Sequence, residues 1–200
     1  MSRYKNYGSQ ISFLDLLFNA LLAFVGFFML TIMQIADDKK STVEVQKMEY
    51  MITLTWPTTS TDDIDLWVVD PLGTIVYFNN KQDGLMHLDR DDFGNKSDEI
   101  ILPDGKKFVY PENREIVSIR GYIPGEYVVN VHAFNKRDPG TVTVNVKLEK
   151  MNPYKMFFVR DLDLSVSGDE KTVCRFVVGS NGNITSVNEG PYKQLIKKAK

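Results

Sequence analysis

Residues 11–35 read ISFLDLLFNALLAFVGFFMLTIMQI and are the one long apolar run of the chain. The run is about 25 residues long, whereas about 20 apolar residues in a helix suffice to cross a bilayer. A cleavable signal peptide has a shorter core, of about 7 to 15 residues, and a small-x-small cleavage site. This run is longer, and the residues that end it, 33–37, lack such a site. The sequence therefore predicts a transmembrane helix over residues 11–35, preceded by a short segment of residues 1–10.

Polar residues lie inside the predicted helix: Asp15, and one turn later Asn19. A carboxylate in a membrane helix costs about 2.5 to 3.5 kcal/mol on insertion scales, so it normally faces another helix or a water-filled path. At about 100° per residue, the small and polar side chains share an arc of about 80°, opposite a bulky apolar face. Small residues let helices approach closely, and polar residues bond across helix interfaces. This polar stripe predicts a helix contact and consists of Ser12, Asp15, Asn19, Ala23 and Gly26.

The helix sequence is similar to that of a known family. The segment SFLDLL at residues 12–17, continued by NALLAF at residues 19–24, resembles the single membrane helix of the B subunits of ion-driven motors. This family includes the flagellar stator B subunit and the ExbD and TolR proteins, and the resemblance covers about residues 8–36. It implies that Asp15, with Asn19 beside it, binds and releases a transported proton or sodium ion. It also implies a multi-span A subunit of the MotA or ExbB type as partner, and a homodimer of this chain.

The charges that flank the helix predict its orientation. Arg3 and Lys5 precede it without any acid, whereas Asp37 and Asp38 offset the two lysines that follow them. The positive-inside rule then favours a cytoplasmic N-terminus. We therefore expect a single-pass protein of the bacterial inner membrane whose larger part lies in the periplasm or otherwise outside the cytoplasm.

Composition excludes some functions. The formal net charge of −2 leaves no strongly basic surface of the kind that binds nucleic acid, so no nucleic-acid partner is expected. The single cysteine, Cys174, excludes an intramolecular disulfide. His87 and His132 are the only histidines, and no nucleophile elbow, zinc motif or phosphate loop is present. We therefore expect that the chain is not an enzyme.

After the helix, residues 36–50 are polar and are predicted to be a linker or an extension of the helix. From residue 51 the pattern changes to short β-rich runs separated by turn signals such as Asn181-Gly182. Many short strands with such turns predict an all-β antiparallel sandwich, of the jelly-roll or immunoglobulin-like type, over residues 51–190, followed by a basic tail, 191–200. The expected strands are 51–56, 63–69, 74–78, 99–102, 115–120, 126–134, 141–148, 157–164, 172–178 and 184–187.

Acidic segments mark this β region. Four segments carry a resemblance: DIDLWVVDPLG at residues 63–73, LDRDDFG at 88–94, Glu99-Ile100 and Pro124-Gly125. Their order resembles a family of bacterial β-sandwich domains. The pattern of that family is D-x-D-L-x-V-x-D-P-x-G, then L-D-x-D-x-x-G, P-E-x-I and P-G-x-Y. The match spans about residues 52–148. It departs from the family pattern at Asp98-Glu99, where Pro would precede the Glu.

These acids suggest a calcium site. Asp63 and Asp65 stand two apart on a predicted strand and so project from one face. A second loop that placed Asp89, Asp91 and Asp92 beside them would assemble the oxygen ligands that calcium requires. The alternative is that these aspartates form turns through bonds to the backbone, with an arginine and lysines nearby as counter-charges. Both interpretations are open at this point.

Two functions follow from the sequence. The first is the B subunit of a proton- or sodium-driven motor, whose external β-sandwich transmits force to a target or binds it. The second is a membrane-anchored binding module outside the cytoplasm, with calcium as a candidate ligand and no ion transport. A multi-span partner subunit is required by the first and not by the second.

Overall fold

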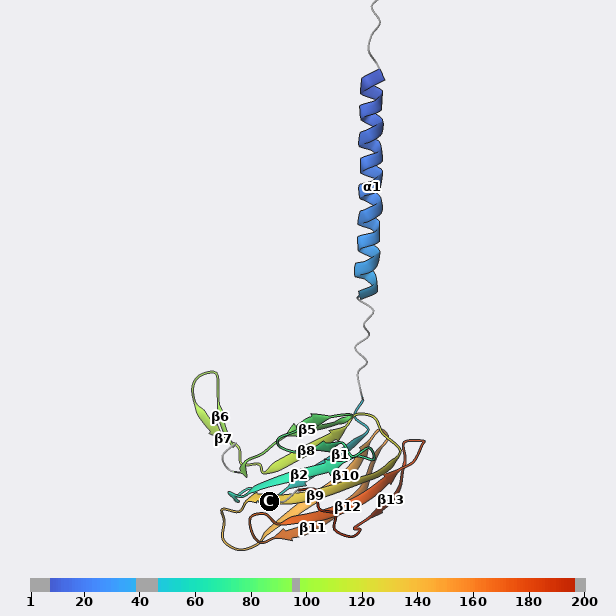
Figure 1. Ribbon diagram of the computed structural model, residues 1–200. Helices are drawn as coiled ribbons and strands as arrows, with labels where there is room; N and C mark the ends of the chain where they lie inside the picture. Colours follow the sequence, from blue (N-terminus) through green and yellow to red (C-terminus); the bar gives the residue numbers. More distant parts are fainter. Residues whose placement is uncertain (1–7, 39–46, 95–97, 197–200) are drawn as a thin grey trace, which may run out of the picture. The chain divides into compact units, whose positions relative to one another are not determined.

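The computed structural model describes residues 8–38, 47–94 and 98–196 (Figure 1). The chain divides into a helical unit, residues 1–45, and a β unit, residues 46–200. The helical unit contains α1, Gly8–Asp38, whose apolar part Ile11–Met33 has a mean hydropathy of 2.3. At 1.5 Å per residue this part is about 34 Å long, enough to cross a hydrocarbon core of about 30 Å. Residues 1–7 and 39–46 of the predicted N-terminal segment and linker lie outside the described residues.

The β unit is built from two antiparallel sheets and a separate hairpin. The strands of the first sheet are β1 Tyr50–Thr55, β4 Gln82–Asp83, β5 Met86–Arg90, β8 Arg114–Ile119, β10 Val142–Met151 and β11 Tyr154–Leu164. Those of the second are β2 Asp63–Val69, β3 Ile75–Val76, β9 Gly125–Asn135, β12 Glu170–Val178 and β13 Ile184–Asn188. The hairpin consists of β6 Glu99–Ile101 and β7 Lys107–Val109.

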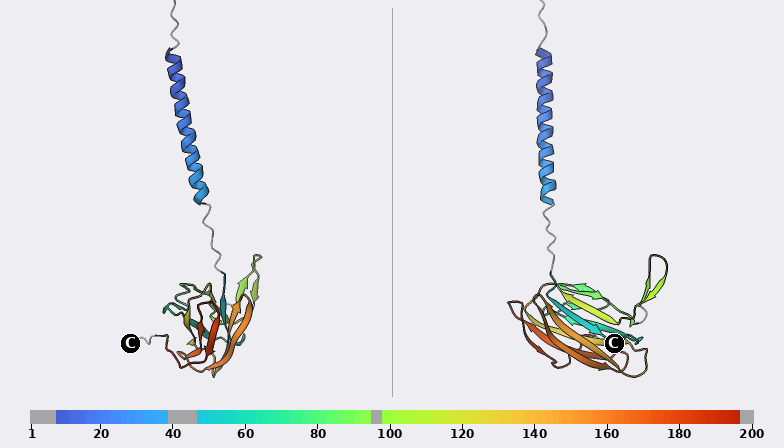
Figure 2. Two further views of the ribbon diagram at one scale, coloured as in Figure 1. Left: turned by 90° about the vertical axis from the view of Figure 1, so that its right-hand side faces the viewer. Right: turned by 180° about the vertical axis from the view of Figure 1, so that it is seen from behind.

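The strand order sets which residues can meet. The first sheet runs β11-β10-β1-β8-β5-β4, and the second runs β13-β12-β9-β2-β3. Figure 2 shows the two sheets as the layers of a sandwich. Between them lies a single core of fully buried side chains, among them Tyr50, Leu66, Val117 and Phe176. The predicted architecture, an apolar helix followed by an antiparallel β-sandwich, is confirmed.

The burial of β2 follows the predicted alternation on one face, but the residues of the other face are buried as well. Ile64, Leu66 and Val68 point into the core, as period-two patterning requires. Asp63 and Asp65 are on the opposite face, yet they too are buried, as is every other residue of β2. Part of the reason is aromatic cover: on this outer face Trp67 stacks on Tyr77 at 4.1 Å between ring centroids, and His132 lies at its edge.

All ten expected strand segments overlap an observed strand, but three further strands were not expected. These are β4, β5 and β7. β5 is the important omission, because it includes Asp89, which the sequence had placed in a loop. The described part of the basic tail, residues 191–196, is neither helix nor strand. It is bound by Glu170, whose carboxylate accepts hydrogen bonds from the N–H of Leu195 at 2.7 Å and from the hydroxyl of Tyr192 at 2.8 Å.

Candidate functional site

The first candidate site is the polar stripe of α1. The helix is continuous through Asp15 and Asn19, so the side chains of the stripe stack on one face at spacings of three and four residues. Every residue from 11 to 33 is exposed in the described chain. In a membrane this exposed face would be available to lipid or to other chains.

The second candidate site is at the open edge of β2. The short strand β3 pairs only with Val68 and Val69, so the first half of β2 has no strand beside it on that side. Glu115 reaches this edge from β8 in the other sheet. Its Oε2 accepts a hydrogen bond from the backbone N–H of Leu66 at 2.7 Å, and its Oε1 accepts one from that of Asp92 at 3.4 Å. A fully buried carboxylate thus takes the place of a missing strand.

Four carboxyl groups gather here, and we call them the acidic cluster: Asp63, Asp65, Asp91 and Glu115. Burial raises the pKa of Glu115 well above its ordinary value, and the charges of Asp65 and Asp91 add to this effect. Burial also raises the pKa of Asp65, although a hydrogen bond with His132 partly offsets it. The pKa of Asp63 is raised by burial and by the charge of Asp65. Each carboxyl group that is ionised here therefore makes ionisation of the others less favourable.

Basic side chains from three places in the sequence partly balance this charge. The pairs are Arg137 with Asp63 at 3.1 Å, His132 with Asp65 at 3.1 Å and Lys81 with Asp91 at 2.7 Å. The carboxylates of Asp63, Asp65 and Asp91 are largely buried, so removal of a basic partner would leave a buried charge less compensated. The acidic cluster is therefore a partly compensated network in which a bound cation would compete with Lys81 and Arg137.

The remaining predicted ligands face arginines. Asp89 pairs with Arg120 at 2.6 Å. Asp92 pairs with Arg90 at 2.9 Å, and its other oxygen accepts the N–H of Gly94 at 3.0 Å, as in a turn. The structure thus brings Asp63, Asp65 and Asp91 together with Glu115, and gives Asp89 and Asp92 other partners.

No group of three or more His, Cys, Asp or Glu side chains within residues 8–38, 47–94 and 98–196 is arranged to hold a metal ion. Calcium binding at this edge therefore stays a prediction. A cation would require Asp63 or Asp91 to turn from its basic partner toward the shared space, because the salt bridges now occupy their oxygens.

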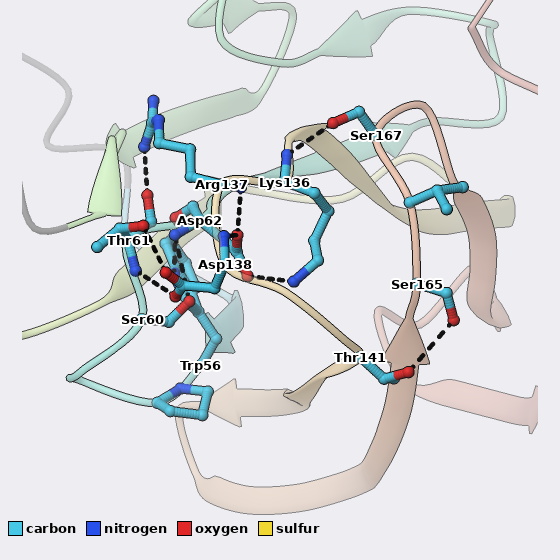
Figure 3. Close-up of polar contacts among 12 residues, drawn as sticks. Trp56, Ser60, Thr61, Asp62, Lys136, Arg137, Asp138, Thr141, Ser165 and Ser167 are labelled. Atoms are coloured by element: carbon cyan, nitrogen blue, oxygen red, sulfur yellow. Dashed lines mark hydrogen bonds and ion pairs between the residues drawn. The ribbon is translucent and has the colours of Figure 1, made fainter.

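A buried ion pair fixes the loops beside the cluster (Figure 3). Asp62, which is 0% exposed, accepts hydrogen bonds from the Lys136 ammonium at 2.5 Å and from the backbone N–H groups of Arg137 at 2.7 Å and Asp138 at 2.9 Å. Burial alone would raise the pKa of Asp62, but these hydrogen bonds outweigh it and lower the pKa. The loop after β9 is thereby held in place, and from it Arg137 reaches Asp63.

Sequence reasoning missed Glu115 and the role of His132. The family pattern predicts a Pro-Glu pair at Asp98-Glu99. Glu99 instead lies in the exposed hairpin and forms a salt bridge with Lys107 at 2.6 Å. Pro111-Glu112 has the missing proline, but Arg114 stands where the pattern has isoleucine, so the pattern does not identify Glu115. No local pattern points to His132, because only the pairing of β9 with β2 puts it opposite Asp65.

Comparisons with known proteins add little. No family model matches the chain, and a comparison with curated proteins finds no match. A solved structure titled "Crystal structure of unknown function protein SAV2460" is similar over 74% of this chain and 90% of that one, with 18% identity and a TM-score of 0.46. Similarity at this level supports no argument about function.

Proposed function

We propose that this chain is the B subunit of a proton- or sodium-driven membrane motor in which Asp15 carries the ion. The observation that carries the proposal is the polar stripe of one continuous apolar helix. Within Ile11–Met33, Asp15 is the one ionisable residue of the sequence. It lies about 6 Å along the helix from Ile11, at 1.5 Å per residue, so an ion could reach it from one side of the membrane.

Energetics favours an active role for this carboxylate. An aspartate held in lipid without a partner is costly, and such residues normally face a protein interior or a water-filled path. One charge that crosses a potential of 100 mV releases about 2.3 kcal/mol. A carboxylate that alternates between its protonated and ionised forms can use this energy by changing how its helix packs against surrounding helices. A dimer of this chain within a multi-span A subunit of the MotA or ExbB type would supply those helices.

The proposal includes an orientation. The N-terminus is in the cytoplasm of a bacterial cell, and the β-sandwich lies in the periplasm or otherwise outside, where it transmits force to a target or binds it. Protease added to spheroplasts should then digest the β unit and spare the N-terminus. Protection of the β unit in intact spheroplasts would reverse the orientation and contradict the motor assignment.

Ion flux tests the central claim. The chain, tagged at its C-terminus, is purified from the membranes of its own host together with its partner subunit and reconstituted into vesicles. Asp15→Asn keeps the size of the side chain and removes its charge, so flux of protons or sodium should be lost while the complex stays assembled. Leu21→Ala, on the bulky face, is the matched control and should retain flux. A fully active Asp15→Asn complex would refute the proposal.

The acidic cluster favours a second candidate function, a membrane-anchored binding module. Four carboxyl groups and three basic partners at one sandwich edge form a site that a cation such as calcium could reorganise. A chain of this kind would keep its activity in the Asp15→Asn variant. It would lose binding of its target when Asp63 or Asp91 is replaced.

A further inference from the structure

The β6–β7 hairpin is the most exposed apolar part of the β unit. Every residue from Glu99 to Pro111 is exposed. Among them are six large apolar side chains, with exposed fractions of 48% for Ile100, 68% for Ile101, 41% for Leu102, 51% for Phe108, 62% for Val109 and 54% for Tyr110. Contiguous apolar surface of this kind marks a site of contact with a protein or a membrane.

Apolar side chains are present on both faces of the hairpin. The register pairs Ile100 with Phe108 on one face, and on the other face it pairs Glu99 with Val109 and Ile101 with Lys107. A protein groove would cover one face and leave the other in water. A fluid lipid layer can surround both faces at once.

The charges of the hairpin are balanced within it. Lys107 pairs with Glu99 at 2.6 Å, and Lys106 pairs with Asp104 at 2.9 Å. These four side chains therefore sum to no net charge, so attraction to anionic groups is not the main source of binding energy. The lysine stems can extend along apolar surface while their ammonium groups stay in the polar layer, which favours a shallow position.

The chain itself places a membrane within reach. Only residues 39–46 separate the end of α1 from the first described residue of the β unit, and an extended chain spans at most about 3.6 Å per residue, or roughly 30 Å here. Within the β unit, Figures 1 and 2 show that the hairpin projects beyond β5, on the same side of this unit as the start of β1. The hairpin and the N-terminal end of the β unit therefore lie on the same side of that unit.

We infer that the β6–β7 hairpin inserts into the interfacial layer of the membrane that holds α1. The apolar side chains of residues 100–102 and 108–110 contact the boundary between headgroups and acyl chains, and the paired charges stay among the headgroups. Tyr110 suits this layer because its ring is apolar and its hydroxyl is polar. The inference rests on α1 being embedded in the membrane, but not on ion transport.

Fluorescence quenching in vesicles of pure phosphatidylcholine tests this inference on the full chain. An environment-sensitive dye is attached to Ile101→Cys, and the matched control is Val159→Cys, which is 51% exposed on β11, an edge strand of the first sheet. The native Cys174 does not compete for dye, because it is 1% exposed and burial raises the pKa of its thiol to about 12.

With nitroxide lipids, the dye at position 101 should shift to the blue and be quenched more by shallow than by deep nitroxides. Interfacial segments lie about 5–10 Å into the boundary layer, so shallow nitroxides should quench the dye more strongly than deep ones. The dye at position 159 should show neither the blue shift nor the quenching. Addition of Ile100→Asp and Phe108→Asp to the labelled Ile101→Cys chain should abolish the quenching, while the melting temperature stays unchanged since both residues are exposed.

Three outcomes would overturn the inference. Equal, weak quenching at positions 101 and 159 would leave the hairpin in water, and disulfide cross-linking of Ile101→Cys between copies would then assign it to a second chain. Quenching that requires anionic lipid would assign the contact to the lysines instead of the apolar side chains. A chain that fails to float with vesicles would remove the membrane premise, and the proposed function with it, whereas a chain that floats without quenching contradicts this inference alone.

Discussion

Glu115 on β8 accepts a hydrogen bond from the backbone N–H of Leu66 on β2 at 2.7 Å, and so joins the two sheets at the place where β2 lacks a neighbouring strand. Burial, and then the charge of Asp65, raises the pKa of Glu115. The folded state therefore holds this proton more tightly than the unfolded chain does. The resulting stability is fully present below the ordinary carboxyl pKa of about 4.3 and is lost as the pH rises from there through the raised pKa.

Glu115→Gln should make the chain more stable near neutral pH and flatten its pH dependence. Glutamine keeps an acceptor for the Leu66 N–H and cannot ionise. Glu115→Ala should instead destabilise by about 1–3 kcal/mol, because it leaves that N–H buried without a partner. Thermal unfolding of the detergent-solubilised chain between pH 4 and 8 measures both effects. A Glu115→Gln chain with the pH profile of the parent would show that this group is not the source of the dependence.

Calcium should raise the melting temperature if the acidic cluster binds it. Extracellular calcium modules bind at about 10⁻⁴ to 10⁻³ M, and a concentration of ten times the dissociation constant adds about 1.4 kcal/mol. Asp63→Asn or Asp91→Asn should remove the response. Asp89→Asn should keep it, because Asp89 faces Arg120. Identical melting in calcium and in EDTA would leave these aspartates as structural partners of basic residues.

Lys136→Ala should be severely destabilising. It leaves the buried Asp62 carboxylate without its cation, and loss of one partner of a buried pair costs about 3–5 kcal/mol. The matched control is Lys106→Ala, whose pair with Asp104 is exposed and screened by solvent, so its loss should hardly change stability. Urea unfolding compares the two variants. A similar, small cost for both would mean that backbone hydrogen bonds alone satisfy Asp62.

Gly94→Ala should cost more than Gly105→Ala, although both glycines have positive φ. A Cβ at Gly94 would lie 2.5 Å from the carbonyl oxygen of Asp62, whereas at Gly105 nothing lies within 4 Å. Gly105→Ala therefore incurs only the cost of a left-handed conformation, about 1–2 kcal/mol. Gly94→Ala must also displace the segment that contains Asp62. Melting temperatures of the two variants measure the difference, and equal shifts would contradict the close packing.

Gly26→Leu should weaken association of α1 with other helices and leave the helix itself intact. Nothing lies within 4 Å of a Cβ at Gly26, so a larger side chain meets no obstacle within this chain. Asn19→Ala should weaken association too, by about 1 kcal/mol for one lost polar contact. Energy transfer between labelled chains in vesicles measures this, with Leu21→Ala as control. Loss of association in the control alone would place the interface on the bulky face.

The fold could be predicted from the sequence to the level of its elements. The length of an apolar run predicts the helix, and alternation of apolar and polar residues between turn signals predicts the strands. Both patterns are local properties of the chain. The strand β5 was missed because it is short and its last two residues, Asp89 and Arg90, are charged. Pairing with the neighbouring strands β8 and β4 stabilises the extended backbone there.

The sequence by itself determined the helix, the presence of Asp15 within it, the class of the β unit and the acidic character of its β2 edge. Only the tertiary structure decided which acids meet. Glu115 and His132 join Asp65 because β8 packs across from β2 and β9 pairs with it, contacts that no local pattern encodes. Whether an aspartate faces a cation, a turn or another carboxylate depends on chain segments up to about seventy residues away, so residue type alone left the neighbours of Asp89 and Asp92 open.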